Sequence, residues 1–506
     1  MKTEQTTVNM TIKEESSSQC IERADAEKST DGTSNDDAAR KLESNLVWKL
    51  DIRILPICAL IYLLCFLDRA NIGNARTLNA DVGNDLVSTL GMSQFQYTMA
   101  LMSFLIAYTL FEVPSNFLLK NTSPSTWLAF LMLCFGALTM SIGASRNFAT
   151  ITALRFMLGM FEAGRFFTLK LQESSSNQFY LGVFPGLVYY ITFWYKGNER
   201  SIRVAVFFAS ATLAGAFGGV LAYGIGRMNQ VCGLEGWRWL FILEGMLSVV
   251  TSVGVYFFLP DYPETASWLS AEEKSLASLR LQVSNSNEQG TAITWKTAKE
   301  TLCEGRLWIH YLIFFLASPP FSSFSLFAPS ITAGLGYSGL RGQLMTVPPY
   351  AVAYVSMMVS SYLADKFNAR GIVASLAALI GGSGYLASAL LPPTSYTERF
   401  GCLILAACGT FSSVPPLLGW LAGNTTSSAM AGLAIALNIS VAAPGQITGI
   451  WIYKRTEAEK GYPTGHYTNA ACLILLSILS FCLMLYYQRQ NAKMVRNGAE
   501  RWFFYL

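Results

Sequence analysis

The chain has 506 residues, of which 52% are hydrophobic and 13% are charged, with a formal net charge of +4. Soluble globular chains carry about 25% charged residues, so this composition argues against a soluble protein. The small net charge gives no indication of a nucleic-acid partner. Ten mostly isolated cysteines and two histidines indicate neither a disulfide framework nor a metal site. We expect no cofactor, and no nucleophile–base pair or metal triad of an enzyme is apparent.

Residues 1–46 consist largely of Ser, Thr, Glu, Asp and Lys, with few large apolar side chains. Such a segment cannot bury enough apolar surface to offset the entropy lost on folding. The composition therefore predicts a disordered cytosolic tail.

Twelve apolar stretches follow the tail, and a polar stretch near residues 260–306 separates the first six from the last six. A helix of roughly 20 apolar residues crosses the hydrocarbon core of a bilayer. The predicted spans are 54–72, 95–119, 127–143, 148–167, 204–225, 239–259, 308–335, 344–364, 372–391, 400–421, 429–453 and 467–487. We therefore predict an all-α membrane protein of twelve transmembrane helices in two six-helix bundles.

The bundles are predicted over residues 47–259 and 307–488, with a cytosolic central loop over 260–306 and a cytosolic tail over 489–506. Orientation follows from Lys and Arg near the span ends, which favour the cytosolic side. More of these residues flank the segments that share a side with the N-terminus. We therefore expect both termini in the cytosol, and a monomer in the plasma membrane.

The ionisable residues of the first six spans include Asp68, Glu112, Arg155, Glu162 and Glu244. Each costs about 2.5 to 3.5 kcal/mol at the centre of a membrane helix, which favours pairing or a water-filled cavity. Seven residues separate Arg155 from Glu162, so one helix face carries both. Two interpretations stay open: ion pairs that lock the bundle together, and a relay for protons or substrate.

The last six predicted spans contain no Asp, Glu, Lys or Arg, so a carboxylate there cannot carry a proton. They contain helix-breaking prolines and the amides Asn438 and Gln446 instead. We predict proton coupling at Asp68, Glu112, Glu162 or Glu244. We predict substrate binding at Arg155, Asn438 and Gln446.

Several motifs resemble the major facilitator superfamily, and within it the fungal anion:cation symporters, which include permeases for allantoate, nicotinate and pantothenate. They are Leu67-Asp68-Arg69-Ala70-Asn71-Ile72-Gly73, Phe111-Glu112-Val113-Pro114-Ser115-Asn116, the run from Arg155 to Gly164, Gly236-Trp237-Arg238-Trp239, and Gly461-Tyr462-Pro463-Thr464-Gly465-His466. The resemblance implies two bundles that rock about a central site. It also implies a gating role for Asp365 and Arg370 in the loop after span eight, whereas the corresponding loop after span two lacks these charges.

Residues 165–182 depart from this pattern, because they insert a polar run after Glu162 at membrane depth. Irregular polar backbone survives there only inside protein or against a water-filled cavity. Without the run, Gly164 would join Val183 and the helix would continue. Back-translation permits intron borders at its two ends, so we hypothesise a retained intron. A genuine re-entrant or cytosolic loop is the alternative.

These observations predict a secondary transporter that takes up a small organic anion with protons. Protonation of a carboxylate would remove a charge that resists movement through a dry barrier. Two alternatives stay open: a nutrient sensor that binds the same ligands without transport, and an inactive product of a wrongly spliced gene.

Overall fold

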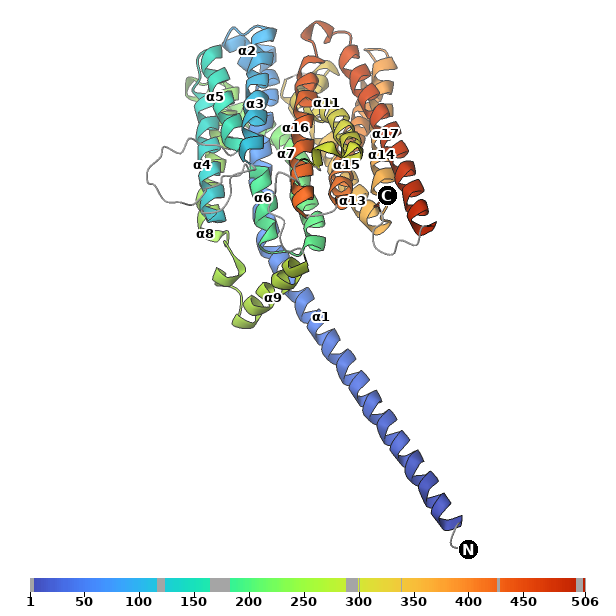
Figure 1. The fold of residues 1–506 in the computed structure, drawn as a ribbon. Helices are drawn as coiled ribbons and strands as arrows, with labels where there is room; N and C mark the ends of the chain where they lie inside the picture. The colour runs from blue at the N-terminus through green and yellow to red at the C-terminus, as the bar shows by residue number, and fades with distance from the viewer. Residues whose placement is uncertain are drawn as a thin grey trace.

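The computed structural model describes residues 4–115, 123–163, 183–287, 299, 301–337, 339–425, 428–496 and 504–505. The regular elements in these ranges are helices (Figure 1). The first half contains α1 (Glu4–Thr77), α2 (Leu86–Thr89), α3 (Gln94–Ser115), α4 (Pro124–Gly143), α5 (Phe148–Glu162), α6 (Val183–Thr192), α7 (Gly197–Ile225), α8 (Gly236–Phe258) and α9 (Ala271–Asn287). The second contains α11 (Gly305–Gly334), α12 (Gly339–Leu344), α13 (Val347–Lys366), α14 (Arg370–Leu390), α15 (Tyr396–Gly423), α16 (Ser428–Trp451) and α17 (Pro463–Arg496).

Nine helices of the described ranges are long and apolar enough to cross a membrane: α1, α4, α7, α8, α11, α14, α15, α16 and α17. Helices α3 and α13, together with the pair α5 and α6, bring each half to six spans. The predicted fold class is confirmed. Figure 1 shows the two halves side by side, with α9 below the first half. We call the end at which α9 lies the inner end, following the predicted orientation.

The fourth span is divided between two short helices. Helix α5 has 15 residues and α6 has 10, which correspond to about 22 Å and 15 Å and leave each short of a full crossing. Both lie against α4. The hypothesised insertion over 165–182 lies outside the described residues.

Helix α1 begins at Glu4, whereas the sequence predicts disorder over residues 1–46. A helix pairs its own backbone groups, so it can extend without a tertiary partner. Figure 1 shows this part of α1 projecting away from the bundle.

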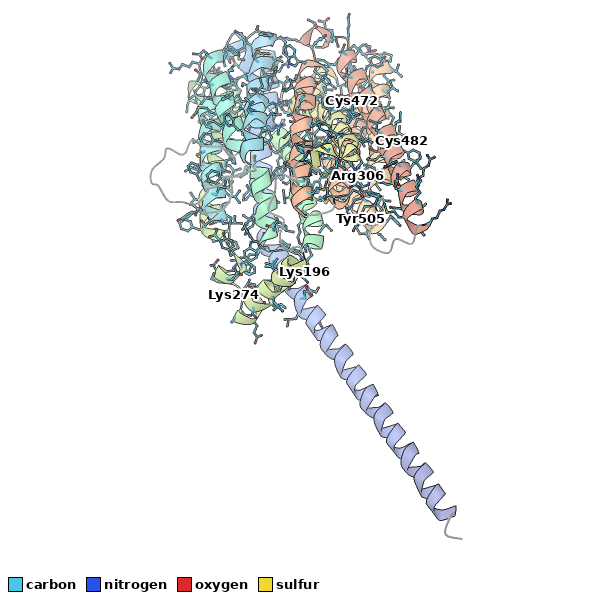
Figure 2. The ribbon with its side chains drawn as sticks, in the orientation of Figure 1. Lys196, Lys274, Arg306, Cys472, Cys482 and Tyr505 are labelled. Carbon is cyan, nitrogen blue, oxygen red and sulfur yellow. The ribbon has the colours of Figure 1, made fainter. Side chains whose placement is uncertain are left out.

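Ion pairs at the inner end tie α9 to the first half. Lys49 Nζ lies 2.9 Å from Glu273 Oε2. Arg280 pairs with both Glu43, at 2.7 Å, and Glu199, at 2.6 Å. Lys196, labelled in Figure 2, also reaches Glu43. The predicted central loop therefore carries a helix that is fastened to the first bundle.

The two halves meet at middle and outer levels. Near the outer end, the Gln343 side chain donates to the Asn74 carbonyl at 3.2 Å and to Thr77 Oγ1 at 2.7 Å. Close packing continues where α7 meets α13, because a Cβ on Gly215 would collide with the Tyr350 ring. Helices α1 and α11 also contact each other across the halves.

Candidate functional site

A small cavity lies between α1 and α11, at the boundary of the two halves. Its walls are formed by Phe66, Arg69, Ala70, Phe321, Ser322, Ser325 and Leu326. The spacing of the α1 residues places them on one face of that helix. The free volume of about 10 Å³ is room for roughly one water molecule. The cavity in this conformation is therefore too small for an organic anion.

Arg69 is the cation of this cavity. Its Nη2 donates to Gln446 Oε1 on α16 at 2.5 Å. The guanidinium also lies 5.2 Å from the Phe104 ring and 5.7 Å from the Tyr108 ring. None of the ion pairs among the described residues involves Arg69. A guanidinium held by rings and one amide retains donors for a carboxylate.

Arg155 lies behind Arg69, outside the residues that line the cavity. It is 1% exposed, and its Nη1 and Nη2 donate to the Arg69 carbonyl at 3.4 and 3.3 Å. Gly159 of the same helix allows close packing against α3, because a Cβ there would collide with the Phe104 carbonyl. Arg155 therefore ties α5 to α1, and Gly159 brings α5 against α3.

Arg69 is not among the site residues that the sequence predicts. Its spacing of three residues from Phe66 and one from Ala70 places it on the helix face that lines the cavity, and this spacing is visible in the sequence.

The four predicted proton-coupling residues occupy different places. Asp68 and Glu244 are each 2% exposed and lie close enough to interact electrostatically. Ser248 Oγ donates to Asp68 Oδ2 at 3.0 Å, and the Asn71 amide donates to Glu244. One oxygen of each carboxyl group has no hydrogen-bond partner among the described residues. This pair joins α1 to α8 on a face other than the cavity wall.

Glu162 lies near the cavity instead. It is beside the Cys65 thiol and within electrostatic reach of Arg69 and Arg155. Glu112 belongs to α3, but its side chain lies outside the described part of the protein. The hydrogen bonds thus join Asp68 to α8, whereas Glu162 lies beside Arg69. Asp68 is also within electrostatic reach of Glu162 and Arg155.

The two substrate-binding residues predicted in the second half, Asn438 and Gln446, lie in different surroundings. Gln446 reaches the cavity through Arg69, whereas Asn438 is 1% exposed and packs within α16 with its Oδ1 unpaired among the described residues. Asp365 and Arg370 form an ion pair of 2.8 Å at the inner end. Arg370 Nη1 also donates to the Gly419 carbonyl at 2.8 Å.

Two six-helix halves around a central cavity with a half-buried cation are typical of multi-pass secondary transporters. Residues 179–450 match the family model of the Major Facilitator Superfamily, and the chain belongs to this family.

Three fungal relatives are also described as transporters. The MFS transporter prlL of Fungal sp. (strain NRRL 50135) is 56% identical over 89% of this chain and 88% of its own length. The MFS-type transporter cnsO of Penicillium expansum is 30% identical over 90% and 85%. The major facilitator-type transporter hxnP of Emericella nidulans is 28% identical over 90% of both chains.

Solved structures share the fold. A bacterial homologue of the human lysosomal transporter Spinster, inward-facing and unoccupied, has a TM-score of 0.62 at 16% identity and covers 85% of this chain and 95% of its own. The xylose transporter XylE from E. coli, partially occluded and inward open, has a TM-score of 0.59 at 14% identity, with coverage of 86% and 97%.

Proposed function

We propose that the chain is a proton-coupled symporter for a small organic anion, with Arg69 as the group that receives the substrate carboxylate. The observation that carries this proposal is the cation at the boundary of the halves, which retains free donors and meets Gln446 from the opposite half. A carboxylate that reaches Arg69 would gain charge-assisted hydrogen bonds at a site with little competing water. Its arrival would also compete with the Arg69–Gln446 bond that joins the halves.

Glu162 is the proton carrier that best fits this arrangement. Its carboxyl group and an incoming anion would share the field of Arg69, so two negative charges would compete for one cation. Protonation of Glu162 removes the negative charge that competes with the substrate for the field of Arg69, and loss of the substrate lets Glu162 ionise again. Proton and anion binding are thereby linked.

The small cavity supports alternating access by movement of the two halves. The contacts of Gln343 with Asn74 and Thr77 favour a conformation that is closed on the outer side. Substrate entry from outside requires these hydrogen bonds to break. The larger substrate space forms between the same cavity walls when α1 and α11 separate.

Uptake into proteoliposomes tests the proposal with a pair of matched compounds. Labelled nicotinate and nicotinamide share a ring and differ in the carboxylate, and labelled pantothenate and allantoate extend the anion panel. We expect accumulation of at least one carboxylate, driven by an inward proton gradient, and no accumulation of nicotinamide. Equal uptake without the gradient, or equal uptake of nicotinamide, would contradict the proposal. Saturable binding without accumulation would favour the sensor.

A further inference from the structure

Phe504 and Tyr505 lie against the inner end of the second half. Neither residue belongs to the lining of the cavity. Figure 2 labels Tyr505 on this half of the molecule. The residues contact four helices, namely α11, α14, α15 and α17. Nothing in the proposed transport cycle assigns a role to this contact.

Two asparagines pair with the backbone of the two residues. Asn491 Oδ1 accepts from the Phe504 N–H at 2.8 Å, and Asn491 Nδ2 donates to the Phe504 carbonyl at 2.9 Å. Asn424 repeats the pattern with Tyr505, at 3.0 and 3.2 Å. Trp420 Nε1 adds a donor to the Tyr505 carbonyl at 2.8 Å. Every backbone polar group of the two residues is therefore paired, as in an added strand.

The two rings are held as specifically as the backbone. Phe504 stacks on Tyr487 with centroids 4.7 Å apart and planes 11° apart. Arg306 covers the Phe504 ring at 4.8 Å, and Arg370 covers the Tyr505 ring at 5.6 Å. Cations over aromatic faces are attracted by the ring quadrupole.

Gly423 leaves the space that the tyrosine ring uses. A Cβ at this position would stand 3.1 Å from both the Tyr505 ring and Arg370 Nη1. Trp420, Asn424 and Tyr487 are each fully buried. The surface is thus a fitted niche, which we define as Asn424, Asn491, Trp420, Tyr487, Arg306 and Arg370.

The niche adjoins the gating pair. Arg370 binds Asp365 and the Gly419 carbonyl with its donors while its face meets Tyr505. Asn424 ends α15, whose last turn contains Trp420. A segment docked here connects α17 to the Asp365–Arg370 turn and to the end of α15.

We propose that this niche is a binding site for the chain's own Phe504-Tyr505 segment, and that the docked segment restrains the inner ends of α14 and α15. The segment is an intramolecular ligand: it stabilises the arrangement of Asp365, Arg370 and Trp420 that it contacts. A ligand that binds one arrangement more tightly shifts the population toward it. Release of the segment therefore loosens the inner end of the second half.

A peptide-binding experiment tests the site without any transported substrate. The probe is a fluorescein-labelled peptide of residues 497–506, added to a shortened protein that ends at Arg496. We expect saturable binding by fluorescence anisotropy. Asn491→Ala removes two hydrogen bonds and should weaken binding about tenfold or more. Lys493→Ala is the matched control, because Lys493 is an exposed residue of the same helix. Absence of binding, or equal binding to the Asn491→Ala protein, would overturn the site.

Hydrogen exchange of the full chain tests the restraint and keeps the proposal falsifiable if the shortened protein fails to fold. In Asn491→Ala, we expect several-fold faster exchange of the Phe504 and Tyr505 amides and of segments 365–371 and 420–425. Lys493→Ala should match the parent protein. Fast exchange of the Phe504 and Tyr505 amides in the parent would disprove docking. Unchanged exchange of the two gate segments would disprove the restraint.

Discussion

At the residue scale, the two arginines of the site, Arg69 and Arg155, have different roles. Arg155 uses its guanidinium on the Arg69 carbonyl, so it stabilises the backbone of α1. Arg69 directs its own guanidinium to the cavity, over Phe104 and Tyr108. A substitution of Arg69 should therefore affect substrate binding, whereas a substitution of Arg155 should affect the fold of the first half.

We expect Arg69→Lys to raise the KM for the transported carboxylate about 10- to 100-fold, because an ammonium cannot replace a guanidinium fork. Thermal stability should change little. Arg155→Lys should lower thermal stability and the amount of folded protein instead. Uptake kinetics and a melting curve of the purified proteins separate the two effects. An unchanged KM in Arg69→Lys would remove this arginine from the binding site.

Glu162→Gln should abolish accumulation against a gradient while counterflow exchange of the anion continues. Glutamine has nearly the shape of protonated glutamate but cannot release a proton. Asp68→Asn and Glu244→Gln are the comparison variants, because that pair joins α1 to α8 away from the residues that line the cavity. Parallel accumulation and counterflow assays with labelled anion measure the difference. Normal accumulation in Glu162→Gln would show that the proton is carried elsewhere.

At the element scale, the division of the fourth span is the main departure from a regular twelve-helix bundle. Neither α5 nor α6 crosses a bilayer alone, whereas their 15 and 10 residues together do. We propose that residues 165–182 are encoded by a retained intron.

Deletion of residues 165–182 should join the two helices and increase the yield of folded protein. Continuous helix through Gly164 and Val183 would pair its backbone groups within the bilayer. Fluorescence-detected size-exclusion chromatography of tagged parent and deletion proteins compares the yields, and transcript sequencing checks the origin of the segment. A deletion that aggregates, together with transcripts that retain the segment, would establish 165–182 as part of the working protein.

The ion pair between Lys49 and Glu273 makes the attachment of α9 sensitive to acid. The Lys49 ammonium, followed by the Ser270 N–H, lowers the pKa of Glu273 below its ordinary value of 4.5. The stability that the Lys49–Glu273 pair gives to the α9 attachment is fully present above pH 4.5. It is lost as the pH falls through the lowered pKa of Glu273. The pair is partly exposed, so it contributes less than about 1 kcal/mol.

We expect a spin label at Leu279→Cys on α9 to become more mobile below about pH 4.5, where Glu273 gains a proton. Glu273→Gln should raise the mobility already at pH 7 and reduce the pH dependence, while the pairs of Arg280 with Glu43 and Glu199 still hold α9. Lys274→Gln is the control, because Lys274 forms none of the ion pairs described. Spectra that respond to pH equally in Glu273→Gln would assign the change to another group.

At the scale of the whole molecule, the outer closure depends on few polar contacts. Gln343 is 1% exposed and bonds to both Asn74 and Thr77 across the halves. Spin labels at Val82→Cys and Tyr396→Cys, both exposed on opposite halves, report the separation of the outer ends.

Gln343→Ala should increase the outward-open population at least about fivefold, since two hydrogen bonds of about 0.5–1.5 kcal/mol each are removed. Pulsed electron paramagnetic resonance between the two labels should then show a longer distance component. Ser375→Ala removes hydrogen bonds within the second half alone and should leave the distances unchanged. Identical distances in the Gln343→Ala protein would rule out this residue as an outer latch.

The sequence by itself determined the membrane class, the division into two halves of six spans and the placement of intramembrane charge in the first half. These properties are local, because the length and apolarity of one segment decide whether it crosses a bilayer. The family resemblance was confirmed at the level of the superfamily, while the anion:cation symporter branch stays a proposal.

Only the tertiary structure decided which charged residue faces the cavity. Helical spacing places Arg155 and Glu162 on one face, but it does not reveal that Arg155 meets the Arg69 carbonyl. Tyr505 and Asn424 likewise carry no sequence signal for one another. Such pairings depend on how helices distant in the chain pack together, and a one-dimensional pattern contains neither the rotation of a helix nor the identity of its neighbour.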